Sequence, residues 1–148
     1  SVGYTIPQRG VLLSTGTIKE KTRLLPAVRS FAALGLALYA TGGTADFLKT
    51  NGVEATWIPW PLDEATPNAL DLIASGDVDL VVNIPKSIEQ DELTNDYLIR
   101  RQAVDRGVPL LVNAETAALF AISIEMLTKD DLKVRAWDDY VPATDGAE

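Results

Sequence analysis

Neither cysteine nor histidine occurs anywhere in the 148 residues of this sequence. Without cysteine the chain can form no disulfide, and it offers no thiolate as a metal ligand or nucleophile. Without histidine it lacks both the usual general base near neutral pH and the commonest metal ligand. These absences exclude a Ser-His-Asp triad and a histidine metal site, and we expect neither metal nor cofactor. The lack of cysteine also fits a cytoplasmic protein.

Basic residues are scarce: 13 Lys and Arg face 21 Asp and Glu, which gives a net charge of −8. Such a surface repels phosphate backbones, so we expect no binding to nucleic acid. Any anionic ligand must instead be held by a local cluster of donors. The longest apolar run, around Phe31–Leu38, is too short to span a bilayer, and we expect no membrane association. The first residue is Ser1 rather than Met, which is compatible with a piece of a longer protein.

Apolar segments and helical patterns alternate along the chain. The segments that read as buried strands are Val11–Leu13, Leu36–Ala40, Ala55–Pro59, Leu80–Asn83 and Val108–Val112. The helical patterns are Lys19–Leu34, Ala45–Thr50, Asn68–Ser75, Asn95–Arg106 and Ala114–Leu127. Strands that are apolar throughout and alternate with helices predict a three-layer α/β/α fold around a five-stranded, mostly parallel open sheet.

The composition divides the chain into two parts. Residues 1–128 carry the whole alternating pattern and are the size of one ordinary domain. Residues 129–148 are acidic and polar, and we expect them to form a loose C-terminal tail or an interface with a partner that the sequence does not include. In the domain, ligands are expected beyond the carboxyl ends of the strands, as in open sheets of this kind.

The segment Thr41-Gly42-Gly43-Thr44 follows the second predicted strand and opens a helix. Its glycines let the backbone approach a ligand closely, with Gly43 at the helix start, and the two hydroxyls lie beside the first helical amides. This combination suits a phosphate or carboxylate. The plainer alternative is that Thr44 caps the helix and the glycines make the turn.

Three further side chains stand at the same edge of the sheet. Lys21 lies in the first turn of a helix, where a cation opposes the helix dipole and is therefore a candidate for binding a ligand; Lys19 competes with it. Trp60 leaves the third strand and could form a pocket wall or belong to the core. Asn83 ends the fourth strand and could form hydrogen bonds with polar atoms of a ligand or cap a loop.

Acid–base chemistry at this edge would have to come from Asp63 and Glu64, which we read primarily as exposed loop acids. The pair Arg100-Arg101 lies in mid-helix. We expect one of these arginines to be exposed and the other to pair with Asp96 or Asp105.

Several of these motifs resemble a known superfamily. Ala40-Thr41-Gly42-Gly43-Thr44-Ala45 resembles the Ala-Thr-x-Gly-Thr-Ala signature of methylglyoxal-synthase-like domains, as do Gly10–Ser14 and Asp79–Asn83. Within it, Asn95–Ala103 and Gly107–Asn113 resemble the C-terminal allosteric domain of the carbamoyl-phosphate synthase large subunit. The resemblance runs from about Pro7 to Leu127.

The resemblance implies a regulatory domain, without catalytic residues, in an enzyme of arginine or pyrimidine biosynthesis. Such domains bind uridine or inosine monophosphate, or N-acetylglutamate, and they work on the remaining domains of the synthase. By this resemblance Lys21, Thr41 and Thr44 would bind the effector. Trp60 stands where nucleotide-binding members have a second lysine. The acetylglutamate-responsive form has a tryptophan there, and it also binds its effector with an asparagine that Asn83 matches.

Lys86 follows Asn83 and could restore the positive charge that Trp60 does not supply. We therefore lean only slightly toward N-acetylglutamate. The main alternative function is a methylglyoxal synthase-type lyase acting on dihydroxyacetone phosphate. It is disfavoured because that enzyme has an essential histidine and a Gly-Pro-Met-Gly-Gly-Asp loop, where this chain has Trp60–Thr66. A stand-alone binding protein and the inosine-monophosphate cyclohydrolase branch share the fold and remain open.

Overall fold

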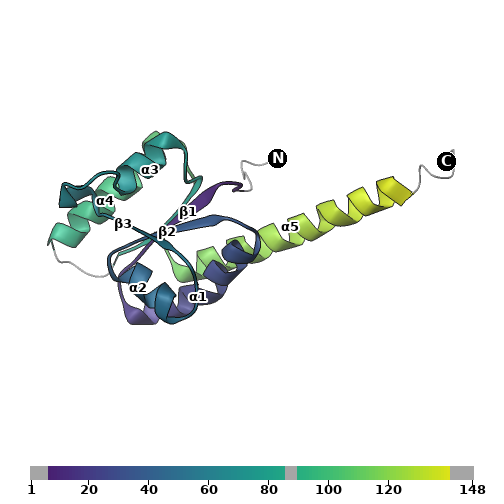
Figure 1. The fold of residues 1–148 in the computed structure, drawn as a ribbon, viewed down its shortest axis with the longest axis horizontal. Helices are drawn as coiled ribbons and strands as arrows, with labels where there is room; N and C mark the ends of the chain where they lie inside the picture. Colours follow the sequence, from purple (N-terminus) through teal and green to yellow (C-terminus); the bar gives the residue numbers. More distant parts are fainter. Residues whose placement is uncertain (1–6, 86–89, 141–148) are drawn as a thin grey trace.

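The computed structural model describes residues 7–85 and 90–140. For residues 90–94 and 129–140 it describes the backbone alone. Strands and helices alternate along the chain, as the sequence predicts (Figure 1). The strands are β1 (Gly10–Thr15), β2 (Ala37–Thr41), β3 (Thr56–Ile58), β4 (Leu80–Ile84) and β5 (Leu110–Leu111). The helices are α1 (Ile18–Ala33), α2 (Gly42–Thr50), the short 3-10 turn η1 (Pro61–Asp63), α3 (Ala69–Ser75), α4 (Gln90–Asp105) and α5 (Ala114–Tyr140).

The five strands form one parallel sheet in the order β3-β2-β1-β4-β5. The chain therefore builds outward from β1 in one direction, through β2 and β3, and then returns to the other side of β1 to add β4 and β5. Ser14 is paired with Asn83 across the join between β1 and β4. This join is the topological switch point, where open α/β sheets leave a crevice at the carboxyl ends of the strands.

Helices cover both faces of the sheet (Figure 1). On one face α1, α2 and α5 pack against side chains such as Val11, Leu13 and Val82. On the other face α3 and α4 pack against Leu12 and Val81. Neighbouring strand residues alternate between the two faces, and both faces are apolar, so every central strand reads as a continuous hydrophobic run. The predicted three-layer α/β/α fold is confirmed.

Local sequence signals account for several boundaries. Thr17 caps α1 by accepting a hydrogen bond from the Glu20 amide, and Asn68 caps α3 in a reciprocal capping box with Asp71. α3 then ends at Gly76, which takes a left-handed conformation that glycine tolerates best. Pro26 lies on the exposed side in the middle of α1 and not in its first turn.

Some boundaries differ from those expected. α2 begins at Gly42, three residues before Ala45, so both glycines belong to the helix. α5 continues to Tyr140, past the expected end at Leu127, and Figure 1 shows it extending well beyond the rest of the fold. The reason is that neither glycine nor proline occurs between Ala114 and Pro142. The segment 129–140 is therefore helical rather than a loose tail. Over the described part of the chain, no helix combines the length and apolar character needed to cross a membrane.

Candidate functional site

A pocket of about 180 Å³ lies at the carboxyl ends of β1, β2 and β4, at the topological switch point. Side chains from both helical layers reach it, because α1 and α2 lie on one side of the sheet and α4 on the other. Its lining consists of Ser14, Thr15, Gly16, Lys21, Thr41, Gly43, Trp60, Ile84 and Asp96. Four predicted site residues, Lys21, Thr41, Gly43 and Trp60, are thus brought together.

Three hydroxyl groups in this lining have no hydrogen-bond partner within the described protein. They belong to Ser14, Thr15 and Thr41, whose exposed fractions are 1%, 5% and 0%. A buried hydroxyl without a hydrogen bond costs about 1–3 kcal/mol, and native proteins rarely leave one unexplained. Three such groups around a single pocket indicate that it is built to receive polar atoms from a ligand or from water.

The start of α2 forms one wall of the pocket. Thr41 occupies the N-cap position, yet its side chain makes no capping hydrogen bond. The first amides of a helix carry a partial positive charge that favours an anion. The interpretation of Thr44 as the N-cap is wrong, because Thr41 holds the cap position.

The two glycines of α2 make room for other side chains. A Cβ atom on Gly43 would lie 3.1 Å from Lys21 Nζ, and one on Gly42 would lie 3.1 Å from the indole of Trp60. Lys21 and Trp60 therefore come close to the helix start, where larger residues at positions 42 and 43 would obstruct them. Gly42 also has a φ of +53°, in the left-handed region.

Lys21, and not Lys19, is the lysine of this pocket. The Lys21 side chain is half-buried and lines the cavity, while Lys19 is exposed and does not. The two residues are two positions apart on α1, so they point in different directions around the helix. The sequence alone left this choice open.

Thr44 does not belong to the pocket lining, because its side chain is bonded to the backbone of β1. Its buried hydroxyl accepts a hydrogen bond from the Thr15 amide at 3.1 Å and donates one to the Thr15 carbonyl at 3.0 Å. The side chain therefore ties the first turn of α2 to the end of β1.

Asn83 also lies behind the pocket lining. Its Nδ2 donates to Asp96 Oδ1 at 2.9 Å, and its Oδ1 accepts from Arg100 Nη1, also at 2.9 Å. Asp96 is 4% exposed and lines the pocket, a role that the sequence did not suggest. The available signal was its spacing from Arg100, because residues four apart share a helix face. Arg100 thus meets Asp96 through Asn83.

Arg101 is the exposed member of the arginine pair, as expected for one of the two, but it is also the one that pairs with Asp105, which was expected of the other arginine. It donates to Tyr97 and to Asp105, which lie four residues away on either side. The hydrogen bond to the Tyr97 hydroxyl, followed by that to Asp105, raises the pKa of the Arg101 guanidinium above its ordinary value. None of these three side chains lines the pocket.

The loop that begins at Trp60 is fixed by hydrogen bonds that its backbone amides donate to neighbouring side chains. Asp63 Oδ2 accepts from the Trp60 amide at 3.1 Å, and Asn95 Oδ1 accepts from the Leu62 amide at 2.9 Å. Asp63 and Glu64 are exposed, and neither lines the pocket. They are loop acids, and the pocket carboxylate comes from Asp96 instead. Lys86, the remaining predicted site residue, lies outside the described residues.

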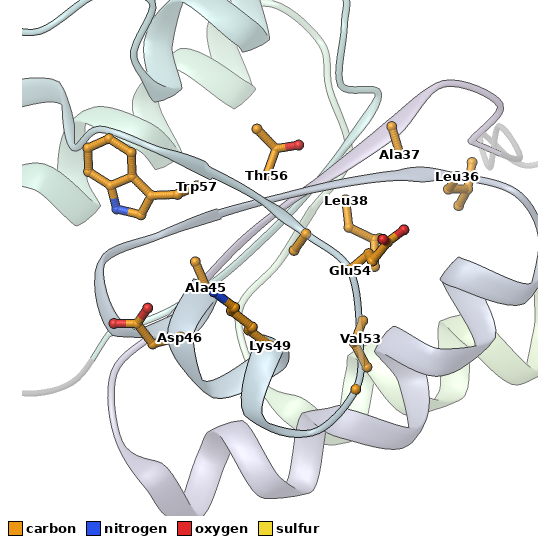
Figure 2. Close-up of a pocket in the computed structure, with 12 residues that line it drawn as sticks. Leu36, Ala37, Leu38, Ala45, Asp46, Lys49, Val53, Glu54, Thr56 and Trp57 are labelled. Carbon is orange, nitrogen blue, oxygen red and sulfur yellow. The ribbon is translucent and has the colours of Figure 1, made fainter.

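A larger and more open groove of about 990 Å³ lies between α2 and the β2–β3 edge of the sheet (Figure 2). Its charged lining residues are Asp46, Lys49 and Glu54, which are exposed. The three unpartnered hydroxyls all lie in the smaller pocket, which we therefore take as the candidate site. In the described segments, no cluster of three or more acidic side chains is arranged to hold a metal ion.

Comparison with known sequences gives a consistent result. The family model described as "MGS-like domain" matches residues 23–112. The chain is 35% identical over 92% of its length to the carbamoyl phosphate synthase large chain of Methanoculleus marisnigri. It is 36% identical over 90% of its length to the human mitochondrial ammonia-dependent carbamoyl-phosphate synthase. A third relative is the multifunctional protein CAD of Squalus acanthias, 34% identical over 86% of the chain.

The chain spans only 13%, 9% and 6% of the lengths of these three relatives. Among solved structures, the methylglyoxal synthase of Elizabethkingia anophelis NUHP1 has a TM-score of 0.58, with 78% of this chain and 79% of that one covered. Its sequence identity of 21% supports a shared fold alone. The family model covers more than half of the chain, and the synthase relatives are similar along nearly all of it, so this chain belongs to the MGS-like domain family.

Proposed function

We propose that this chain is the effector-binding regulatory domain of a carbamoyl-phosphate synthase large chain, serving arginine or pyrimidine biosynthesis. Its effector is a small anion, and the pocket at the ends of β1, β2 and β4 binds it. The observation that carries this proposal is the set of three buried, unpartnered hydroxyls in a pocket that Lys21 also lines. The remaining domains of the synthase are the partners on which the domain acts.

The chemistry of the lining suits an acidic group. Hydroxyl groups of Ser14, Thr15 and Thr41 can donate to its oxygens, and Lys21 supplies positive charge. The start of α2 adds its partial positive charge. This local cluster is needed because the protein as a whole carries a net charge of −8, which repels anions.

The size of the pocket limits what it encloses. The volume of the pocket is about 180 Å³. Pockets for drug-sized ligands are larger, at about 300–1,000 Å³. The enclosed part of the effector is therefore one acidic group with its immediate neighbours, and the rest of a nucleotide would lie outside the pocket.

A lyase acting on dihydroxyacetone phosphate is the alternative. Proton abstraction would need a base, and Asp96 is the carboxylate among the described lining residues. Asp96 already accepts a hydrogen bond from Asn83, and the chain has no histidine that could serve as an acid–base group. The regulatory function is therefore preferred.

The test is titration calorimetry and thermal unfolding with N-acetylglutamate, uridine monophosphate, inosine monophosphate and inorganic phosphate. A ligand at a hundredfold excess over its Kd should stabilise the protein by about 2.7 kcal/mol. Thr41→Val and Lys21→Ala should each weaken the binding by about tenfold or more, as expected for hydrogen bonds that involve a charged group.

Matched controls are Thr50→Val, at the exposed end of α2, and Lys19→Ala, on the same helix as Lys21. Both should bind like the unsubstituted protein. The proposal fails if none of the four ligands binds, or if Thr41→Val and Lys21→Ala leave the affinity unchanged.

A further inference from the structure

The outer face of α5 carries large apolar side chains that the domain leaves in contact with solvent. Leu119, Ile122 and Met126 are 66%, 52% and 61% exposed. Their spacing of three and four residues places them on one side of the helix, over about two turns. Phe120 and Ile124, on the opposite side, are buried in the core. α5 is therefore apolar on two opposite faces, and the described protein covers only the inner one.

α5 also extends past the elements that support its first half. It runs from Ala114 to Tyr140, and at 1.5 Å per residue its 27 residues span about 40 Å. Figure 1 shows its end leaving the sheet and α1 behind. Most helix stability in proteins comes from the packing of an apolar face, so a helical segment without tertiary contacts gains little. A projecting end and an apolar outer face both indicate that α5 lies along another surface.

The size of the relatives indicates which surface this is. The chain spans at most 13% of the three synthase-type relatives, so most of each of those polypeptides lies outside the matched region. Contiguous exposed apolar side chains on a soluble protein mark interfaces, and a domain within so long a chain has neighbouring domains to contact. A lipid surface is disfavoured, because membranes with anionic headgroups repel a protein with a net charge of −8.

α5 is in direct contact with the helix that carries Lys21. Arg23, two residues after Lys21 on α1, forms an ion pair with Glu115 in the first turn of α5. Apolar side chains of α1 and α5 also pack in the same core cluster. A ligand that alters the position of α1 at the pocket therefore has a short physical route to α5.

We propose that the outer face of α5, defined by Leu119, Ile122 and Met126, docks against a neighbouring domain of the synthase large chain. The surface that receives it is apolar, because polar groups buried against these side chains would lose their hydrogen bonds to water. This inference rests on the proposed function, since it places the chain in a synthase. The docked helix connects the effector pocket, through α1, to the domain on the other side of the interface.

Hydrogen exchange of the α5 backbone amides tests the docking without any substitution. The 148-residue chain is compared with the synthase large chain that carries it, both without effector. Amides from Leu119 to Tyr140 should exchange about tenfold or more slowly in the large chain, because a docked helix opens less often. Amides of α4 from Tyr97 to Asp105 lie in the layer on the other face of the sheet, and they should exchange equally in both proteins.

Substitutions in the large chain then test the face itself. Ile122→Asp and Met126→Asp, combined, place two charges on the interface and should return the α5 amides to their rate in the 148-residue chain. The same variant should lose most of the effect of the effector on synthase activity, while the Kd of the effector in the 148-residue chain stays the same. Val104→Asp is the matched control, because Val104 is apolar, 66% exposed and on α4. It should keep both the slow exchange and the effector response.

The outcomes separate this inference from the proposed function. Equal exchange of α5 in the two proteins, or slow exchange that persists in the double variant, overturns the docking face and leaves the proposed function in place. A 148-residue chain that sediments as a dimer, and that Ile122→Asp converts to a monomer, assigns the face to a second copy and also overturns the proposal. If α5 is protected in the large chain but none of the four effectors binds, the docking face is supported and the effector-binding function fails.

Discussion

The hydroxyl of Thr44 is bonded to the backbone of Thr15 in both directions, accepting from its amide and donating to its carbonyl. Its single proton is thereby committed to the end of β1. Thr41, three residues earlier, has a buried hydroxyl with no partner in the described protein. The two threonines of one short motif thus differ in their hydrogen bonding. Thr44 joins α2 to β1, and Thr41 belongs to the pocket lining.

The first prediction separates these two roles by stability. Thr44→Val leaves the buried amide and carbonyl of Thr15 without their partner, and should lower the free energy of unfolding by about 1–3 kcal/mol. Thr41→Val removes a hydroxyl that has no partner, so the free energy of unfolding should stay the same or rise slightly. Chemical denaturation measures both values, with Thr50→Val as the control. Equal destabilisation by the two substitutions would contradict the assignment.

The second prediction concerns the glycines at the start of α2. At Gly43 a Cβ would press on Lys21 Nζ, the far end of a flexible side chain that can move. Gly43→Ala should therefore fold at least as stably as the unsubstituted protein, helped by the helix propensity of alanine. It should bind N-acetylglutamate or a nucleoside monophosphate more weakly, because Lys21 is displaced.

Gly42→Ala should behave differently. The left-handed φ at this position costs a residue with a Cβ about 1–2 kcal/mol, and the indole of Trp60 leaves little space. The free energy of unfolding should fall by at least that amount. Thermal unfolding and ligand titration of the two variants check both statements, and a Gly43→Ala protein that binds with full affinity would show that Lys21 is not needed there.

The sequence predicted the fold and part of the pocket because both follow from local patterns. Apolar strands alternating with helices determine a parallel sheet, and the strand ends then point to Lys21, Thr41, Gly43 and Trp60. Thr44 and Asn83 lie at the same edge of the sheet, but their side chains form hydrogen bonds with other groups of the protein. Whether a polar group faces a ligand or the backbone depends on long-range packing, which no local pattern reveals.

Asp96 was missed for a related reason. It reaches the pocket from inside α4 and not from a strand end, so the rule that selected the other residues could not find it. Its place depends on how α4 lies over β4, and on the bond from Asn83. The extension of α5 to Tyr140 was missed because an acidic composition was read as a tail, although no helix-breaking residue intervened.

The third prediction is the absence of lyase activity. The chain has no histidine, Asp63 and Glu64 do not line the pocket, and Asp96 accepts a hydrogen bond from Asn83. Incubation with dihydroxyacetone phosphate should yield methylglyoxal no faster than a sample of the Asp96→Asn variant at equal concentration. A rate well above that of the variant would assign Asp96 as a catalytic base and reverse the preference between the two functions.

The last prediction concerns the choice between a phosphate-bearing effector and N-acetylglutamate, and it depends on Trp60. The indole lines the pocket and stands against Gly42, where it offers an apolar face and one N–H donor. A lysine at this position would add a full positive charge, which a phosphate dianion needs more than a carboxylate does. Trp60→Lys should therefore raise the affinity for uridine monophosphate relative to that for N-acetylglutamate by about tenfold, the effect of one charge-assisted hydrogen bond. Trp60→Phe keeps the apolar wall without adding charge, and it should leave the relative affinity close to that of the unsubstituted protein. Titration calorimetry of the three proteins with both ligands gives the ratios. If the unsubstituted protein already binds uridine monophosphate tightly and Trp60→Lys does not change that affinity, Trp60 does not determine the choice of effector.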